Sequence, residues 1–304
     1  MQYKKLAIPF ILRIRGVMVA ALVSVLMPVY NTKVEYLKEA IDSILGQTYD
    51  NFELLILNDC STDDRVEKTV LSYNDRRIKY HKNEKNLGIS GSRNKLVDLA
   101  SGEYLAVMDH DDISLPSRFE KEVELLDNKK DVGVVSCWHK LVGCSKIKKL
   151  PIDNEEIEKQ LLFKCCILHP ASMIRKSVLL ENKIRYENEF TPAEDYALWC
   201  RLIGKTKFAN IPSVLFEYRK YGTNTTAKQK NKMVANTCRI HEFVRHDNSQ
   251  IWDTVKHRIS EITCLKLFGF LPLIYIVKRN NKTKFYLFYK ILLFSTKSRT
   301  VYIS

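Results

Sequence analysis

Short apolar segments alternate with amphipathic segments along the first 140 residues, and this alternation limits the folds open to the chain. Residues 22–29 form an apolar run rich in β-branched residues, and residues 34–47 follow with apolar side chains at helical spacing. The same order recurs, which predicts further strands at 52–59, 78–83, 104–109 and 132–138 and further helices at 64–74, 89–100 and 117–129. Such a pattern predicts an α/β fold whose mostly parallel sheet is covered by helices on both faces. Ligands of these sheets bind outside the carboxyl ends of the strands.

The composition is that of a folded protein with an excess of basic residues. The chain has 304 residues, of which 45% are hydrophobic and 28% charged, and its formal net charge is +14. The last 54 residues hold ten Lys or Arg against two acidic residues, so +8 of that charge lies there. The excess suggests an anionic partner, such as nucleic acid, a membrane surface or an anionic small molecule.

The cysteines and the first residues both indicate a cytoplasmic protein. The eight cysteines form no CxxC pair, which is typical of reduced thiols in a reducing compartment. Arg13 and Arg15 interrupt the apolar core that a secretory signal would need, so secretion is not expected. Met18 stands just before the first clear strand, and residues 1–17 are interpreted as an extension.

The pattern becomes less regular after Lys140. Helices are expected at 155–164 and 194–204, a short strand at 171–177, and two separate strands at 208–212 and 214–221. Residues 226–270 are predicted to be helical with weak breaks. No repeat or Pro/Gly/Ser-rich linker divides the chain, so its two halves are expected to share one body.

Acidic side chains gather where the strand at 104–109 should end. Asp109, Asp111 and Asp112 follow a wholly apolar segment, and a solvated, capped turn is one interpretation. The other is a metal site, because Asp109 and Asp111 converge on one ion if the chain turns at the strand end. Oxygen ligands of this kind select Mg²⁺ or Mn²⁺, which keep positions open for phosphates.

Other candidate site residues are weaker on their own. Gly88 and Gly91 lead into a helix that bears Arg93, an arrangement suited to a nucleotide, although glycine in a plain turn is the common alternative. Glu194 and Asp195 stand at a helix start, where acidic residues are favoured for stability or where one carboxylate can serve as a general base. His169 and Arg219 are structural residues or contacts to a metal or a phosphate.

The ordered set of motifs resembles the inverting family 2 glycosyltransferases, which have the nucleotide-sugar-binding GT-A fold. The resemblance runs from Val23 to Thr226 and is carried by VSVLMPVYN, LLILNDCSTDD, NLGISGSRN, YLAVMDHDDISLPSRFE, HPASMIRKSVL and EDYALWCRLIG. It implies a GT-A domain at 18–226, with a nucleotide half at about 18–140 and an acceptor half at about 141–226. Residues 227–304 remain as a helical, basic region.

The resemblance also implies roles for matching positions. Asp195 would be the catalytic base, Asp111 the direct metal ligand, and Asp112 the acid that often follows this motif. The remaining matches would bind the donor: Pro28, Tyr30 and Asn31 line the nucleotide pocket, Asp59 binds the base, Arg93 approaches the nucleotide, and Asp109 lies near ribose and metal. Two positions depart from the pattern, since Cys60 stands where relatives often have glycine and Tyr221 where many have histidine.

The resulting expectation is a metal-dependent transfer from a nucleotide-sugar to a saccharide or polyprenyl-linked acceptor, in bacterial surface polysaccharide assembly. A UDP-sugar is the first choice, with dTDP-sugars next, because Asp59 can bind the imide N–H that uracil and thymine share. The basic tail is interpreted as a surface that lies on an anionic membrane or as a packed helical subdomain; its apolar blocks are too short to span a bilayer.

Three other functions account for only part of these sequence features. A nucleic-acid binder leaves the acidic strand ends unexplained, so no nucleic-acid partner is expected. A nucleotidyltransferase would use a similar metal and sheet but would not need the Glu194–Asp195 pair. A catalytically silent relative would not need the intact Asp109, Asp111 and Asp195.

Overall fold

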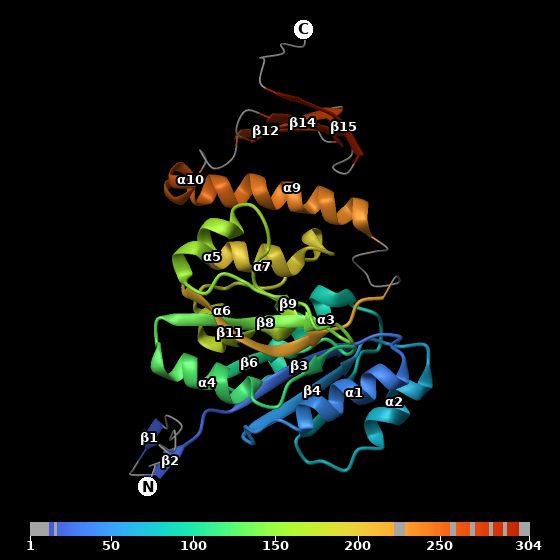
Figure 1. Cartoon of the computed structure of the whole chain (residues 1–304). Coiled ribbons are helices and arrows are strands. Elements are labelled where there is room, and N and C mark those ends of the chain that lie inside the picture. The colour runs from blue at the N-terminus through green and yellow to red at the C-terminus, as the bar shows by residue number, and fades with distance from the viewer. Residues whose placement is uncertain are drawn as a thin grey trace.

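A nine-stranded sheet forms the centre of the molecule (Figure 1). The computed structural model describes residues 12–14, 17–221, 229–255, 260–267, 271–279, 282–287 and 291–297. The strand order is β5-β4-β3-β6-β10-β8-β11-β7, with β9 paired to β8. The strands are β3 (Val23–Val29), β4 (Phe52–Asn58), β5 (Ile78–Lys82), β6 (Tyr104–Val107), β7 (Ile113–Ser114), β8 (Val132–Leu141), β9 (Ile147–Lys148), β10 (Met173–Arg175) and β11 (Lys207–Tyr218).

Helices cover both faces of this sheet, as predicted (Figure 1). One layer packs under the sheet: α1 (Val34–Leu45), α2 (Asp64–Leu71) and α4 (Arg118–Asn128). The other layer comprises α3 (Gly88–Leu99), α5 (Asn154–Leu161), α6 (Lys176–Glu181), α7 (Glu194–Leu202), α9 (Lys230–Asp247) and α10 (Ser249–Val255). Successive residues of β3 face opposite layers, so every residue of this strand is buried. That two-sided burial is why its sequence reads as a continuous apolar run.

The sheet is mostly parallel, which confirms the predicted fold class, but one central strand runs the other way. Strands β3, β4, β5, β6, β8 and β11 share one direction, whereas β10 pairs antiparallel with both β6 and β8. The short strand β7 pairs antiparallel with β11. The parallel strands bring the ends of β3, β4 and β6 to the same edge, where the acidic side chains lie.

The two strands predicted at 208–212 and 214–221 are one long strand, β11. It pairs in parallel with β8, and the register shifts between Ile211 and Val214. Proline lacks the N–H that a regular ladder needs, and the irregularity accommodates Pro212 without ending the strand. The prediction of a break was therefore wrong, and β11 carries the chain across the sheet to the candidate site.

The prediction of a helical C-terminal region is correct only as far as Val255. Beyond α10 the chain forms four antiparallel strands: β12 (Ser260–Leu267), β13 (Leu271–Arg279), β14 (Lys282–Leu287) and β15 (Ile291–Lys297). The segment is rich in Ile, Tyr, Phe and Thr, which favour strands. Near the N-terminus, β1 (Leu12–Ile14) of the predicted extension pairs antiparallel with β2 (Val17–Val19), which begins at the last residue of that extension.

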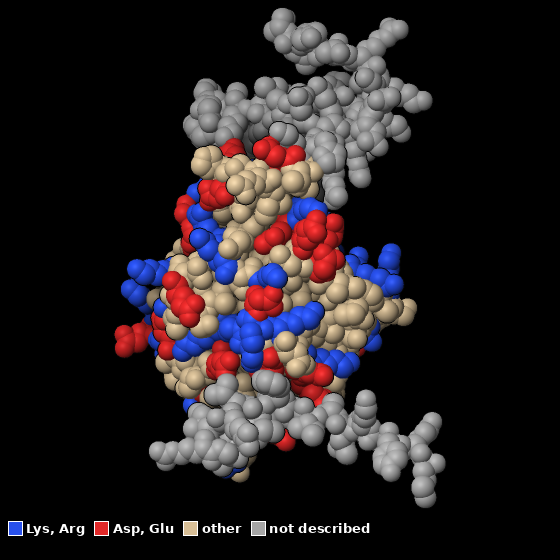
Figure 2. Space-filling view, turned by 90° about the vertical axis from the view of Figure 1, so that its left-hand side faces the viewer, with Lys and Arg blue, Asp and Glu red and all other residues tan. Residues whose placement is uncertain are grey.

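Basic and acidic side chains are mixed on the face of the molecule that Figure 2 draws. On this face the basic side chains form a band with acidic side chains beside them. Much of the excess positive charge lies in residues 251–304. Within the described residues, no helix combines the length and apolar character needed to cross a bilayer.

Candidate active site

The three aspartates after β6 are close in sequence, and Asp112 is buried in the structure. One oxygen of Asp112, Oδ1, accepts a 2.7 Å hydrogen bond from the backbone N–H of Arg219. Its other oxygen, Oδ2, is buried without a partner in the structure. Burial, followed by the charges of Asp109 and Asp111, raises the pKa of Asp112 well above its usual value. Asp112 therefore gives up its proton less readily than an ordinary aspartate.

Arg219 and Tyr221, at the end of β11, contact the same loop. The Arg219 Nε donates a 2.7 Å hydrogen bond to the carbonyl of Asp111, and another guanidinium nitrogen pairs with Glu39 of α1. The Tyr221 hydroxyl donates a 2.7 Å hydrogen bond to Asp111 Oδ2. Two segments more than a hundred residues apart in sequence are thereby joined around Asp111.

Arg93 links the aspartate loop to the helix that begins at Glu194. Its guanidinium is buried and lies 2.7 Å from Glu194 Oε1 and 3.1 Å from Asp109 Oδ1. Burial alone would lower the pKa of Arg93, but Asp109 and Glu194 raise it above its usual value. Arg93 therefore remains a cation. It lies between Asp109 of the aspartate loop and Glu194, the neighbour of the predicted base Asp195.

The predicted base, Asp195, has an unusually basic carboxylate. Burial, followed by the charge of Glu194, raises its pKa to about 6, although Arg93 and a 2.7 Å hydrogen bond from the Tyr196 N–H act in the opposite direction. Glu194 is buried and its Oε2 has no partner in the structure, whereas Asp195 is partly exposed. Of the two adjacent carboxylates, Asp195 is the one that solvent can reach.

His169 lies behind this site. It is buried, its Nε2 is 2.9 Å from the Tyr186 hydroxyl, and its ring packs against Trp199 of α7. Burial, followed by the charge of Arg93, lowers its pKa well below the usual value, so the ring is neutral at physiological pH. The guanidinium of Arg93 stacks over Tyr186 at 5.5 Å. These contacts place His169 in a shell that supports Arg93 and α7, and Tyr186 belongs to that shell although the sequence pattern did not single it out.

The residues expected to bind the nucleotide lie at the ends of β3 and β4. Asp59 is buried, and its Oδ1 accepts hydrogen bonds of 2.8 Å from Asn83 Nδ2 and from the Leu87 N–H. The Asn31 side chain accepts from the Thr62 N–H at 2.9 Å, which joins the two loops. Tyr30 is 47% exposed and Pro28 is buried within β3. The sheet thus brings these four residues to one edge, with Tyr30 free to meet a ligand.

Cys60 takes a backbone conformation that explains why glycine suits its position. Its φ is +61°, in the left-handed region that costs a residue with a side chain about 1–2 kcal/mol. Glycine adopts this conformation without that cost. The substitution therefore keeps the turn after Asp59 but adds local strain.

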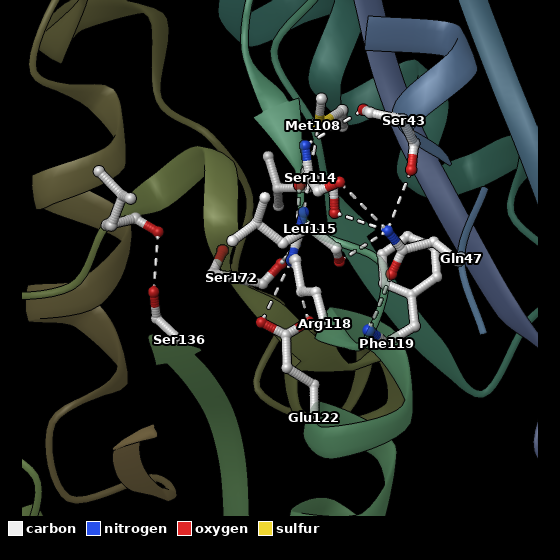
Figure 3. A network of polar contacts seen from close by, with 12 residues as sticks. Ser43, Gln47, Met108, Ser114, Leu115, Arg118, Phe119, Glu122, Ser136 and Ser172 are labelled. Atoms are coloured by element: carbon white, nitrogen blue, oxygen red, sulfur yellow. Dashed lines mark hydrogen bonds and ion pairs between the residues drawn. The ribbon is translucent and has the colours of Figure 1, made fainter. Parts of the chain in front are cut away.

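A buried polar network around Arg118 and Gln47 lies beside the end of β6, just before the aspartate loop (Figure 3). Arg118 is fully buried; it donates to the Val107 carbonyl at 3.0 Å and lies 3.2 Å from Glu122 of the same helix. Gln47 donates to the Leu115 carbonyl at 2.9 Å and accepts from the Phe119 N–H at 3.1 Å. Because Val107 lies two residues before Asp109, Arg118 fixes the end of β6. Sequence reasoning did not single out Arg118; its spacing of four from Glu122 was the available signal.

The carboxylates fit a hard divalent cation bound in an open site. Asp109, Asp111 and Asp112 offer only oxygen ligands, including the unpartnered Oδ2 of Asp112. Across the described residues, no three His, Cys, Asp or Glu side chains are placed to enclose an ion. Mg²⁺ and similar ions are commonly held by one or two carboxylates and completed by water and substrate phosphates. The residues present match that type of site.

Comparison with known proteins shows the family of this chain. The family model described as Glycosyl transferase family 2 matches residues 24–182. An uncharacterized glycosyltransferase of Methanocaldococcus jannaschii is 31% identical over 269 residues, covering 86% of this chain and 90% of the relative. The Escherichia coli UDP-Glc:alpha-D-GlcNAc-diphosphoundecaprenol beta-1,3-glucosyltransferase WfgD is 29% identical over 211 residues, covering 69% of this chain and 81% of WfgD.

Two solved structures share the fold. The S. aureus TarS structure in complex with UDP-GlcNAc has a TM-score of 0.60 at 18% identity, covering 76% of this chain and 72% of TarS. The mannosyltransferase PcManGT from Pyrobaculum calidifontis, in complex with GDP-Man and Mn²⁺, has a TM-score of 0.59 at 16% identity, covering 77% of this chain and 68% of PcManGT. With its aspartate loop, its mostly parallel sheet and these similarities, the chain belongs to glycosyl transferase family 2 and is a glycosyltransferase of the GT-A fold.

Proposed function

We propose that this enzyme is a metal-dependent, inverting glycosyltransferase that moves a sugar from a UDP-sugar to a hydroxyl of a saccharide or lipid-linked saccharide. The observation that carries the proposal is the position of Arg93 between Asp109 and Glu194, at 3.1 and 2.7 Å. It joins the carboxylates suited to a metal–diphosphate with the start of the helix that bears Asp195. This arrangement supports a donor-binding site and a catalytic base that lie at the same edge of the sheet.

Asp195 is suited to remove the proton of the acceptor hydroxyl. Its partly exposed carboxylate has a pKa of about 6, so it is ionised at neutral pH and is more basic than an ordinary aspartate. As the acceptor oxygen bonds to the anomeric carbon, its proton passes to Asp195 and the bond from that carbon to the diphosphate breaks. A single displacement from the side opposite the leaving group inverts the configuration.

Asp111 and Asp109 would hold the cation, which when bound supplies positive charge to the departing diphosphate. Arg219 is fixed beside them through the carbonyl of Asp111 and the carboxylate of Asp112. Arg93 keeps Glu194 paired, which limits the repulsion that raises the pKa of Asp195. In this proposal Asp109 and Asp111 bind the cation, and Asp195 accepts the proton.

The choice of donor and acceptor rests on chemistry and on relatives. Asp59 lies at the end of β4, where its carboxylate suits a uracil or thymine imide, and TarS binds UDP-GlcNAc. WfgD acts on GlcNAc-diphosphoundecaprenol. We extend this to a lipid-linked acceptor in surface polysaccharide assembly at the cytoplasmic membrane face, where the basic residues after Val255 would favour anionic lipid.

The first test is thermal unfolding with UDP, dTDP, GDP and CDP, each with and without Mn²⁺. We expect UDP with Mn²⁺ to raise the midpoint most, since a ligand at 100 times its Kd adds about 2.7 kcal/mol of stability. Asp111→Asn should abolish the Mn²⁺-dependent part, because the amide is a weaker ligand than the carboxylate. Glu120→Gln, an exposed change on α4, should leave it intact.

Either of two results would contradict this assignment. Equal stabilisation of wild type and Asp111→Asn by UDP and Mn²⁺ would remove Asp111 from the metal site. No stabilisation by any of the four nucleotides would favour a catalytically silent relative.

The pH dependence of transfer provides a second test. With UDP-glucose and GlcNAc-diphosphoundecaprenol as trial substrates, we expect kcat/KM to fall about tenfold per pH unit below an apparent pKa of about 6. The reason is that protonated Asp195 cannot accept the hydroxyl proton. An acid limb near the ordinary aspartate pKa of about 3.9 would be inconsistent with this base in this environment.

A further inference from the structure

The strongest unexplained contact of the aspartate loop is the hydrogen bond from Tyr221. The phenol comes from the segment after β11 and donates to Asp111 Oδ2 at 2.7 Å. We propose that Tyr221 is a positioning residue for the metal site: it holds one oxygen of Asp111 and thereby presents the other to a divalent cation. The inference rests on the proposed function, because it concerns how this chain orients its predicted metal ligand.

The phenol is itself held by a stack of side chains from α1 and from the segment that follows β11. The Tyr221 and Tyr36 rings pack with centroids 5.7 Å apart, and the Arg219 guanidinium lies 4.3 Å from the Tyr36 centroid. Arg219 also binds the Asp111 carbonyl and, through its N–H, Asp112. Separate contacts therefore fix the Tyr221 hydroxyl and the Asp111 carboxylate relative to each other. A carboxylate anchored in this way loses less freedom when it binds a cation.

Asp111 and Asp109 differ in the charge of the group that donates a hydrogen bond to each carboxylate. The Tyr221 hydroxyl is a neutral hydrogen-bond donor at physiological pH, as phenols ordinarily are. It orients Asp111 without cancelling its charge. Asp109, by contrast, lies 3.1 Å from the permanently charged Arg93. In the proposed site the Asp109 carboxylate is thus held by a cation and the Asp111 carboxylate by a neutral donor, which favours Asp111 as the principal ligand.

A competing role for Tyr221 predicts the opposite change in the affinity for the cation. If the phenol merely occupied Asp111 in competition with the cation, its removal would strengthen cation binding. If it orients the ligand, its removal weakens binding, since loss of such an outer partner typically costs about 10–100-fold in metal affinity. The sign of the change therefore separates positioning from competition.

The test measures Mn²⁺ affinity directly, without turnover. Free Mn²⁺ is followed by electron paramagnetic resonance during titration of wild type, Tyr221→Phe and Tyr36→Phe, each saturated with the nucleotide that stabilises wild type most among UDP, dTDP, GDP and CDP. We expect Tyr221→Phe to bind Mn²⁺ about 10–100-fold more weakly. Tyr36→Phe, which removes a hydroxyl from the same stack but not from Asp111, should bind Mn²⁺ as wild type does.

Two further measurements separate positioning from general damage. Nucleotide affinity in EDTA should be the same for Tyr221→Phe and wild type, because the lost hydrogen bond serves the cation. The unfolding midpoint in EDTA should fall only by the few degrees that the loss of one hydrogen bond costs. Unchanged or tighter Mn²⁺ binding by Tyr221→Phe would overturn the inference while leaving the proposed function standing. Absence of Mn²⁺-dependent nucleotide binding in wild type would instead overturn the proposed function.

Discussion

Asp195→Asn should lower kcat for sugar transfer by about 10²–10⁴-fold while the affinity for nucleotide and Mn²⁺ stays the same. The amide has nearly the shape of the carboxylate but cannot accept the acceptor proton. Steady-state kinetics and nucleotide titration together check this result. Glu189→Gln changes another carboxylate, one that is exposed and paired with Arg239, and should leave both quantities unchanged. Transfer at the wild-type rate by Asp195→Asn would remove Asp195 from the role of base.

Asp195→Asn should also change how the stability of the protein depends on pH. Because the pKa of Asp195 is raised to about 6, the folded state binds this proton more tightly than the unfolded state does, and wild-type stability falls as pH rises from about 4 to about 6. The amide of the variant has no such proton to lose. We therefore expect Asp195→Asn to unfold at a higher temperature than wild type at about pH 7.5, and this gain to shrink as the pH is lowered toward about 4. A variant inactive because of misfolding would show the reverse.

Arg118→Met should lower the free energy of unfolding by about 3–5 kcal/mol, because it leaves the fully buried Glu122 without its cation. Burial, partly offset by Arg118, already raises the pKa of Glu122 to about 7. Without Arg118 that pKa rises further, so the mutant continues to lose stability above about pH 7 after wild type has stopped. Urea unfolding at about pH 6 and about pH 8 checks the size of the loss and its growth with pH.

The double variant Arg118→Met with Glu122→Leu separates stability from site geometry. Replacing a buried ion pair by apolar residues of similar volume is often neutral, so we expect most of the lost stability to return. Mn²⁺-dependent nucleotide binding should stay weakened, because the Val107 carbonyl has still lost the donor that fixes the end of β6. Full recovery of both properties would show that Arg118 serves the core alone.

The fold was predictable where one physical pattern dominated. The apolar runs at β3, β4 and β6 follow from burial on both faces, and the residues of α1 that face the core repeat at helical spacing. The direction of a strand does not produce such a pattern in the sequence. A strand as short as β10 contains no residue that distinguishes a parallel from an antiparallel place in the sheet, and its insertion between β6 and β8 depends on distant pairing. The C-terminal strands were missed because short apolar runs fit either a helix or a strand.

The acidic side chains of the candidate site stand out in the sequence, whereas the contacts that hold them do not. Asp109, Asp111, Glu194 and Asp195 are visible as polar groups after an apolar strand or at a helix start. Their contacts with Arg93, Tyr221 and Arg219 join segments about 16 to 110 residues apart. Arg118 was hidden for another reason: a charged residue in a helix normally faces water, and only the packed structure reveals its complete burial.

The interleaving of strands around β10 bears on how such enzymes can be recombined. The predicted acceptor half supplies β10 to a place between β6 and β8 of the predicted nucleotide half, and it supplies β11 as the partner of β7. Exchanging residues 141–226 with those of a relative would therefore replace interior strands rather than an attached module. A chimera meant to change acceptor preference would better graft individual loops near Asp195 and leave these strands, and the Arg93–Glu194 pair, to the parent sequence.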